Sequence, residues 1–480
     1  MKKVITLSLA AALSTTAFAS SSIQSQIDEL KEKIAQLEKK QKSNTKRISK
    51  VNKLANNDNL KFNVDFRPAY DYVSYKAANG DKKSNSIFSN RLWVNMAYAP
   101  TENLYFYATL AYYKTYGQSV LPKQGFNYYD WIVNETANPS DELRVKEAFF
   151  LYKNDTFLGF DIPWTASIGR RPSTDGLLVN YREDQKAKSA IGHNINMEFD
   201  GASFGYQLEN VIGVEGMFLK FCLGRGMSNV NSRYSGLSSN GDGTFSVNGT
   251  LDYAKVDGFS NTDLLGVLFN PYDDGQYSVH TVWFDALNLP GMYATDNTYS
   301  KFTFEQQGDV QGGAIAFVAD GIGDGISDML DDTVFFASLA YSKTDPDSGK
   351  TMLGSSDKKT GTSFYVGANW ACQLIDDARV GVEYNHGSKY WRSFTYGEDT
   401  MAGSKLATRG DAYEIWFNKE LIGKKLTAQV RYTYMDYKYT GSQAFFGDGG
   451  APMSIDQAVA RGLNPIDSAQ DVRFYIRYRY

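Results

Sequence analysis

The last ten residues of the chain, DVRFYIRYRY at positions 471–480, decide the class of fold. Two kinds of side chain alternate along them: Val472, Phe474, Ile476, Tyr478 and Tyr480 share one face of an extended chain, and Arg473, Tyr475, Arg477 and Arg479 share the other. Because successive side chains of a strand point to opposite faces, this pattern predicts a strand between an apolar and an aqueous medium. Strands of membrane-spanning barrels have this pattern.

The same period of two begins at Leu60, where Phe62, Val64 and Phe66 alternate with polar side chains. Alternation and turn residues together predict sixteen strands, near 60–72, 87–99, 104–115, 142–153, 162–171, 202–211, 215–225, 263–271, 277–287, 311–318, 333–343, 362–372, 379–390, 411–418, 426–438 and 471–480. The connection 319–332 is long for a turn, and the strands near 263–271 and 311–318 are weakly patterned. Eighteen strands are therefore the alternative.

The connections between the predicted strands alternate between short and long, as in outer-membrane barrels, whereas a soluble sandwich has no reason to keep this asymmetry. No stretch of about twenty apolar residues occurs, so the sequence does not predict a membrane-spanning helix. Aromatic residues make up 14% of the chain. We therefore expect an all-β fold in which residues 58–480 form an antiparallel transmembrane β-barrel.

One predicted strand is ambiguous, because Leu143 to Phe150 place a charged side chain on both faces in any register. A β-bulge would resolve this conflict, since one extra residue changes the face to which the following side chains point.

The N-terminal region has a different character. Met1-Lys2-Lys3, an apolar stretch to Leu13 and Ala17-Phe18-Ala19 predict a secretory signal peptide over residues 1–19. Residues 20–57 then carry a heptad pattern, with Ile27, Ile34, Gln41, Ile48 and Ala55 at a and Leu30, Leu37, Asn44 and Val51 at d. This spacing predicts a short periplasmic α-helical coiled coil, with one long solvated helix as the alternative. Its net positive charge favours contact with anionic peptidoglycan, although a solvated charged face is the commoner explanation.

The chain end resembles the C-terminal signature of bacterial outer-membrane barrels, in which a terminal aromatic residue, here Tyr480, and alternating apolar residues are read by the barrel-assembly machinery. The order of signal peptide, coiled coil and barrel resembles the coiled-coil-preceded trimeric porins. More closely, it resembles a porin-like family of unknown function from epsilon-type proteobacteria. Local similarities are the stretches IGRRP at 168–172 and VEYNHGSKYW at 382–391. The resemblance implies a pore, a homotrimer and an outer-membrane location in contact with lipid, without implying a substrate.

A barrel of sixteen to eighteen strands is wide enough for an aqueous channel, so passive diffusion of small hydrophilic solutes is the expected function. The third of the long connections, 172–201, is the candidate constriction, because the third loop of trimeric porins commonly folds into the lumen. Its side chains at the constriction would be Tyr181, Arg182, Glu183, Asp184, Lys186 and Lys188. The alternative is a loop that lies over the mouth of the barrel.

The lumen-facing positions of the predicted strands hold more basic than acidic residues. They hold Arg67, Arg91, Arg171, Arg379, Arg431, Arg473, Arg477 and Arg479, against Asp65, Asp71, Glu209, Glu383 and Glu414. This excess predicts a weak preference for anions. The alternative is that these arginines are paired with carboxylates across the wall.

Catalysis has little support, because His193, His280 and His386 lie in separate segments and no catalytic motif occurs. The stretch from Asp345 resembles a calcium loop but has Ser356 at the position that requires an acidic residue. We expect neither enzyme activity nor a cofactor, a metal site or a nucleic-acid partner. Cys222 and Cys372 are predicted on opposite sides of the wall, which argues against a disulfide. The competing functional hypothesis is a structural protein that tethers the outer membrane to the cell wall through the basic coiled coil.

Overall fold

A computed structural model of the chain describes residues 60–117, 142–171, 176–229, 237–240, 242–247, 260–294, 302–323, 325–395 and 400–480. The predicted signal peptide (1–19) and the predicted coiled coil (20–57) lie outside the described residues.

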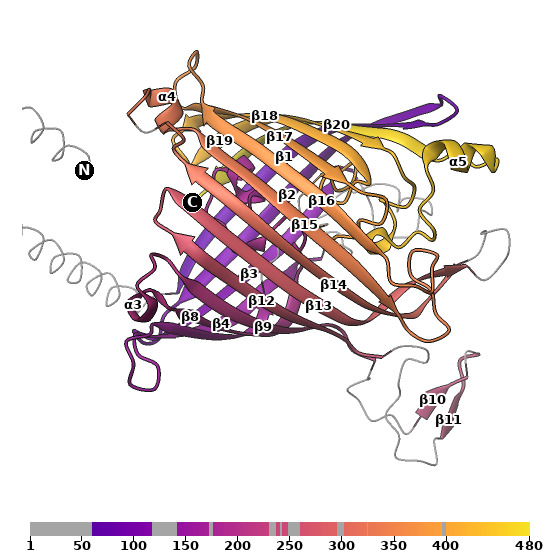
Figure 1. The fold of residues 1–480 in the computed structure, drawn as a ribbon, viewed down its shortest axis with the longest axis horizontal. Helices are drawn as coiled ribbons and strands as arrows, with labels where there is room; N and C mark the ends of the chain where they lie inside the picture. Colours follow the sequence, from indigo (N-terminus) through magenta and orange to yellow (C-terminus); the bar gives the residue numbers. More distant parts are fainter. Residues whose placement is uncertain are drawn as a thin grey trace, which may run out of the picture. The chain divides into compact units, whose positions relative to one another are not determined.

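Sixteen strands of the described part form a closed antiparallel barrel (Figure 1). In order around the barrel they are β1 (Lys61–Ala77), β2 (Lys82–Tyr98), β3 (Leu104–Thr115), β4 (Arg144–Asn154), β5 (Trp164–Arg171), β8 (Phe199–Gln207), β9 (Phe218–Met227), β12 (Thr262–Asp273), β13 (Tyr277–Ala294), β14 (Phe302–Asp320), β15 (Val334–Pro346), β16 (Thr360–Ala371), β17 (Ala378–Gly387), β18 (Gly410–Ile422), β19 (Leu426–Tyr437) and β20 (Ile466–Arg479). The prediction of sixteen strands is confirmed, and the alternative of eighteen is wrong.

The barrel closes where the last strand, β20, pairs with the first, β1. Asp71 lies opposite Arg473 in this pair, and Asp65 lies opposite Arg479. Two backbone hydrogen bonds of 3.0 Å between Val64 and Tyr480 extend the pairing to the final residue. Closure leaves no edge strand with unpaired backbone groups, which a lipid bilayer requires.

The two rims of the barrel differ. One rim, here called the short-turn rim, holds the connections after β2, β4, β8, β12, β14, β16 and β18; it includes α3 (Glu209–Ile212), α4 (Asp328–Asp331) and the C-terminus. The opposite rim, the long-loop rim, carries α5 (Ile455–Ala460), η3 (Phe445–Gly447) and the small sheet of β10 (Leu237–Ser239) and β11 (Phe245–Val247). The alternation of short and long connections has exceptions at the long-loop rim, because β1 and β2 extend to a four-residue turn, 78–81, and β13 and β14 extend until only residues 295–301 join them.

The connection between β14 and β15, which raised the possibility of eighteen strands, adopts one turn of helix instead of extra strands. This helix, α4, begins after Ser327, whose side chain accepts a hydrogen bond from the backbone N–H of Leu330. The weak patterns of β12 and β14 also have a physical reason. Their inward side chains, such as Leu264, Val310 and Val318, are buried in an apolar cluster inside the barrel. Both faces of these strands are therefore apolar, which removes the alternation.

The ambiguous fourth strand, β4, contains the β-bulge that the sequence required. Thr109 of β3 pairs with Glu147 and Leu110 pairs with Val145, so Lys146 is the extra residue. Lys146 lies 5.2 Å from the ring of the buried Trp93, and Glu147 accepts a 2.7 Å hydrogen bond from Thr109. The bulge thereby turns both charges toward the interior.

The outer face of the barrel exposes large apolar side chains on nearly every strand. Examples are Ile168, Leu339, Ile415, Phe106 and Phe221, of which Leu339 is 59% exposed. Soluble monomers rarely expose an apolar surface of this extent, whereas a lipid bilayer solvates it. The outer face is therefore suited to lipid.

None of the helices in the described ranges is long and apolar enough to cross a membrane.

Candidate functional site

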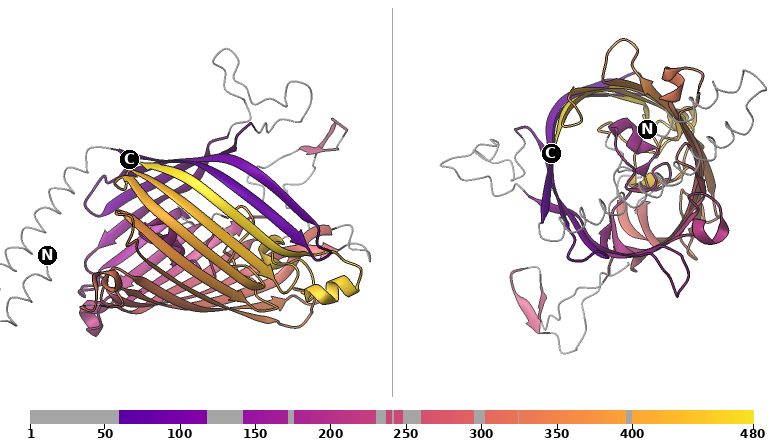
Figure 2. Two further views of the ribbon diagram at one scale, coloured as in Figure 1. Left: turned by 90° about the horizontal axis from the view of Figure 1, so that it is seen from above. Right: turned by 90° about the vertical axis from the view of Figure 1, so that its left-hand side faces the viewer.

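One connection at the long-loop rim enters the barrel. This inward loop, residues 176–198 between β5 and β8, contains β6 (Gly176–Leu177), η2 (Val179–Glu183) and β7 (Ser189–Ile191), and β6 pairs with β7 in parallel. Figure 2 shows its short helix inside the ring of strands. The carbonyl of Arg182 accepts hydrogen bonds of 2.9 Å from Asn418 of β18 and Gln429 of β19. The loop thus reaches the opposite wall.

Ion pairs fix the tip of the inward loop to that wall. Arg182 lies 3.0 Å from Glu414 of β18. Glu183 accepts a 2.8 Å hydrogen bond from the Tyr475 hydroxyl and lies 3.1 Å from the guanidinium of Arg477, both on β20. Arg182 and Glu414 are almost completely buried, so each charge depends on the other for compensation.

Further buried charges extend these pairs into a charge cluster, which comprises Asp65, Asp71, Arg91, Arg182, Glu183, Glu383, Lys405, Glu414, Arg431, Arg473 and Arg477. Arg431 lies 3.8 Å from both Glu183 and Glu414. Arg473 pairs with Asp71, Arg477 with Asp65, and Arg91 with Asp65 at 3.2 Å. Four arginines of the wall, Arg91, Arg431, Arg473 and Arg477, are therefore paired with carboxylates, as the alternative to a basic wall proposed.

Lys405 belongs to the charge cluster but was not among the residues predicted from the sequence. It comes from the connection between β17 and β18 and pairs with both Glu383 and Glu414. Trp391 of the same connection is buried and donates a 2.7 Å hydrogen bond to the Leu406 carbonyl. An apolar Trp391 and Phe394 within a polar connection were the available signal that this segment also packs inside the barrel.

The other side of the inward loop packs in the apolar cluster. Leu178, Val179 and Ile191 are buried there with Phe284 and Tyr365 of the wall. The loop also contributes a buried histidine, His193. Its two ring nitrogens lie 2.9 Å from the Ser338 hydroxyl and 2.8 Å from the Ser363 hydroxyl. The inward loop thus has one charged and one apolar face, and each matches the wall that it contacts.

Two of the titratable groups in the inward loop, Glu183 and His193, have lowered pKa values. Burial disfavours the charged form of Glu183, but Arg477 and Arg182 outweigh this effect and lower the pKa of its carboxyl to about 2. Burial lowers the pKa of His193 to about 3, so its imidazole is neutral at physiological pH.

The structure distributes the remaining predicted residues of the loop and wall over several places. Tyr181 stacks on Phe336 with ring centroids 5.8 Å apart, and Asp184 pairs with Lys424 at 2.9 Å. Lys186 and Lys188 are exposed. The Lys188 ammonium lies 5.9 Å from the Trp93 ring.

The predicted wall residues also lie at different places in the barrel. Arg67 lies over the ring of Tyr475 at 5.1 Å, and Arg379 pairs with Asp332 at 2.8 Å near the short-turn rim. The placement of Glu209 on a lumen-facing strand is wrong, because β8 ends at Gln207 and Glu209 begins α3.

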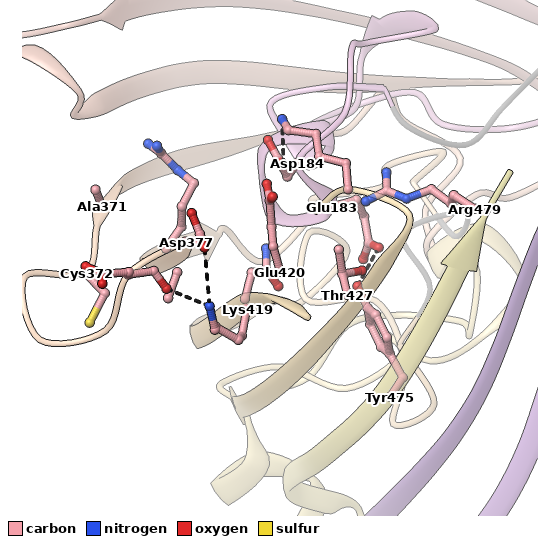
Figure 3. A pocket seen from close by; sticks show the side chains of 15 residues that line it. Glu183, Asp184, Ala371, Cys372, Asp377, Lys419, Glu420, Thr427, Tyr475 and Arg479 are labelled. Carbon is pink, nitrogen blue, oxygen red and sulfur yellow. Dashed lines mark hydrogen bonds and ion pairs between the residues drawn. The ribbon is translucent and has the colours of Figure 1, made fainter. Parts of the chain in front are cut away.

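A cavity of about 550 Å³, here called the rim cavity, lies between the loop tip and the short-turn rim. Figure 3 shows Glu183 and Asp184 beside Tyr475 and Arg479 in this cavity. The opposite side is lined by Asp377 of the turn after β16 and by Lys419 of β18, whose side chains lie 3.8 Å apart. Acidic and basic groups are mixed around it, so the rim cavity has no dominant charge.

Cys222 and Cys372 are both free thiols. In the described ranges, no group of three His, Cys, Asp or Glu side chains is arranged to hold a metal ion.

Residues 81–480 match the model of a family described as "Protein of unknown function (DUF3373)". No curated protein matches the chain. Among solved structures, the in-vitro folded OmpT of Vibrio cholerae is 11% identical, with 88% of this chain and 97% of that chain covered and a TM-score of 0.45. An anion-selective porin from Comamonas acidovorans is 11% identical, with coverages of 88% and 100% and a TM-score of 0.46. The outer membrane channel DcaP of Acinetobacter baumannii is 12% identical, with coverages of 88% and 97% and a TM-score of 0.45.

Replacing Glu414 by Gln tests the charge cluster. Arg182, Arg431 and Lys405 would lose a shared carboxylate, so we expect the free energy of unfolding to fall by about 3–5 kcal/mol in urea titrations of the reconstituted protein. The matched control is Asp345→Asn, which breaks the exposed pair with Lys358 and should cost less than about 1 kcal/mol. Equal effects of the two substitutions would contradict a buried, interdependent cluster.

Acid should release the inward loop. His193 is neutral inside the barrel but protonates in a released loop. The docked position of the loop therefore loses stability as pH falls from the usual histidine pKa of 6.5 toward the lowered pKa of about 3. Protonation of Glu183 removes further stability of the docked loop as pH falls from the usual glutamate pKa of 4.5 toward the lowered pKa of about 2. We therefore expect single-channel conductance, corrected for bulk conductivity, to rise on acidification.

His193→Gln should remove the part of this rise that begins near pH 6.5, whereas the matched control His386→Gln should not, because His386 is half exposed beside Asp411. Conductance that stays constant from neutral to acid pH would show that neither group holds the loop.

Proposed function

The chain belongs to the family described as "Protein of unknown function (DUF3373)", and we propose that it is a non-enzymatic porin of the bacterial outer membrane for passive diffusion of small hydrophilic solutes. The observation that carries the proposal is a closed sixteen-strand barrel with an apolar outer face and charged side chains on its inner wall. A barrel of this size can enclose an aqueous channel. Charged residues on the inner wall are the groups that interact with hydrated solutes.

The inward loop is the proposed constriction of this channel. Tyr181, Arg182, Glu183, Asp184, Lys186 and Lys188 lie on it, and its contacts with β18, β19 and β20 support a narrowing of the interior. Arg67, Arg379, Glu383, Glu414, Arg431, Arg473, Arg477 and Arg479 are the proposed wall residues. Because the charge cluster is internally compensated, large charge selectivity is not expected from it.

A weak anion preference is the proposed selectivity. Lys186 and Lys188 of the inward loop are exposed, and Lys188 lines one cavity of the interior together with Arg171 and Lys220. These cations attract anions, but water and salt screen exposed charges, so the preference is small.

A barrel in the outer membrane also needs partners for its insertion and its oligomerisation. We propose that the last strand, β20, which closes on β1, is recognised by the barrel-assembly machinery, and that the N-terminal heptads join subunits into a homotrimer in the outer membrane. The coiled coil would lie in the periplasm. The basic residues of this segment could then also contact peptidoglycan.

A structural tether is the second candidate function, and one observation favours it. The inward loop and the connection between β17 and β18 fill part of the interior, with Trp391, Phe394 and Leu406 buried in the apolar cluster. A barrel closed by its own loops would anchor the coiled coil to the membrane without conducting solutes.

Liposome swelling separates the two functions. The porin proposal predicts that vesicles containing the protein swell in small sugars, and that reversal potentials under a salt gradient show a slight preference for anions. Clear cation selectivity would overturn the selectivity assignment. Absence of swelling, together with sedimentation on purified peptidoglycan that is lost when residues 20–57 are deleted, would replace the porin by the tether.

A further inference from the structure

A second cavity, here called the side cavity, lies between the inward loop and the wall formed by β5, β8, β9, β12 and β13. Its volume is about 80 Å³. It exists partly because Gly266 of β12 has no side chain, and a Cβ atom there would lie 3.5 Å from the Cβ of Cys222. One water needs about 10–15 Å³ by this kind of measure, so the side cavity can hold roughly five to eight non-hydrogen atoms.

Three cationic residues line the side cavity, Lys188, Arg171 and Lys220, and the last two have no carboxylate partner in the described part of the chain. Arg171 of β5 and Lys220 of β9 are both half-buried, and no described carboxylate lies within ion-pair distance of either. The Arg171 guanidinium is oriented by a 2.6 Å hydrogen bond to Ser167 and lies 4.3 Å from the ring of Phe149. The nearby carboxylates are already engaged, since Glu198 pairs with Lys146 and Glu147 accepts from Thr109. Glu147 acts on Arg171 only from beyond ion-pair distance, and positive charge that is held in place with so little compensation attracts an anion.

Asn196 supplies an independent observation. This residue of the inward loop lines the side cavity and is only 2% exposed. Neither its amide nitrogen nor its amide oxygen has a hydrogen-bond partner in the described part of the chain. A buried amide without partners costs roughly 1–3 kcal/mol per unsatisfied group, so a buried side chain of this kind points to a ligand that the amide would contact.

Apart from Lys188, most of the remaining lining is apolar. Leu264, Val282 and Phe284 form the wall on the side of β12 and β13, and Met197 of the inward loop completes it. An inorganic anion would leave this surface in contact with water, whereas a short hydrocarbon chain would cover it.

From these features we propose that the side cavity binds a short-chain aliphatic monocarboxylate, with its carboxylate at Arg171, Lys220 and Asn196 and its hydrocarbon chain against Leu264, Val282 and Phe284. The evidence for the binding site is the geometry of the barrel. A role of this site in binding a solute during permeation rests on the proposed porin function. A four-carbon acid has six non-hydrogen atoms and fits the estimated capacity of roughly five to eight.

Cys222 reports occupancy, because its thiol lies in the lining of the side cavity. In the Cys372→Ser protein, folded in detergent, the rate of labelling of Cys222 by uncharged methyl methanethiosulfonate is followed by mass spectrometry. Butyrate should slow the labelling in a saturable manner. Butyramide, propylammonium and phosphate at equal ionic strength should have little effect. Butyramide and propylammonium lack the negative charge, and phosphate lacks the hydrocarbon chain. If the thiol does not react without ligand, the butyrate-dependent rise in unfolding temperature gives the same titration.

Lys220→Gln should raise the half-protecting butyrate concentration about tenfold, as expected for loss of a charged hydrogen-bond donor. Lys358→Gln, an equal charge change on an exposed side chain of another connection, should leave it unchanged. Labelling and unfolding temperature that do not respond to butyrate, or equal protection by butyramide or phosphate, would overturn the site. Protection by butyrate without liposome swelling would support the binding site and contradict the channel. Swelling without protection would support the channel and contradict the binding site.

Discussion

The pairing of Arg182 and Glu183 with the far wall of the barrel is the interaction on which the interior of this protein depends. Charges with almost no access to water must be compensated, and Glu414 and Arg477 provide the compensation at 3.0 Å and 3.1 Å. A loop that carried only one of these charges would lose one of its two ion-pair contacts with the far wall, and the wall residue would keep only its partners within the wall and the connection between β17 and β18. The ion pairs therefore hold the loop tip across the lumen, and its position defines both the rim cavity and the side cavity.

The apolar half of the interior follows from the same placement. Once the loop tip is fixed at β18 and β20, Leu178, Val179 and Ile191 lie against the inward faces of the opposite strands. Those strands need apolar side chains toward the loop as well as toward lipid. The barrel wall is thus of two kinds, polar around the charge cluster and apolar on both faces where the loop packs.

This division explains which features the sequence could predict. The strands were predictable because lipid on one side and polar groups on the other impose a period of two, as in β20 with its alternating Phe474 and Arg473. The bulge at Lys146 was predictable from a local conflict of charge. Strands β12 and β14 gave weak patterns because Leu264 and Val310 face the apolar cluster rather than water.

The pairings inside the barrel were not predictable in the same way. Arg182 and Glu414 are separated by more than two hundred positions, and no local pattern records which carboxylate a lumen arginine meets. Lys405 was missed because its connection reads as a polar surface loop, although Trp391 and Phe394 within it were a signal of burial. For the same reason, the basic residues of β20 gave no indication that Asp65 and Asp71 compensate them.

The central claim is that the inward loop narrows the lumen of an open barrel. The most direct test is to replace residues 180–187 by a glycine–serine linker of equal length and to compare single-channel conductance in planar bilayers. A same-length replacement in the connection between β9 and β12 serves as control. A larger conductance for the first replacement, with the control unchanged, is the predicted result. Equal conductance of the first replacement and the unaltered protein would contradict the claim.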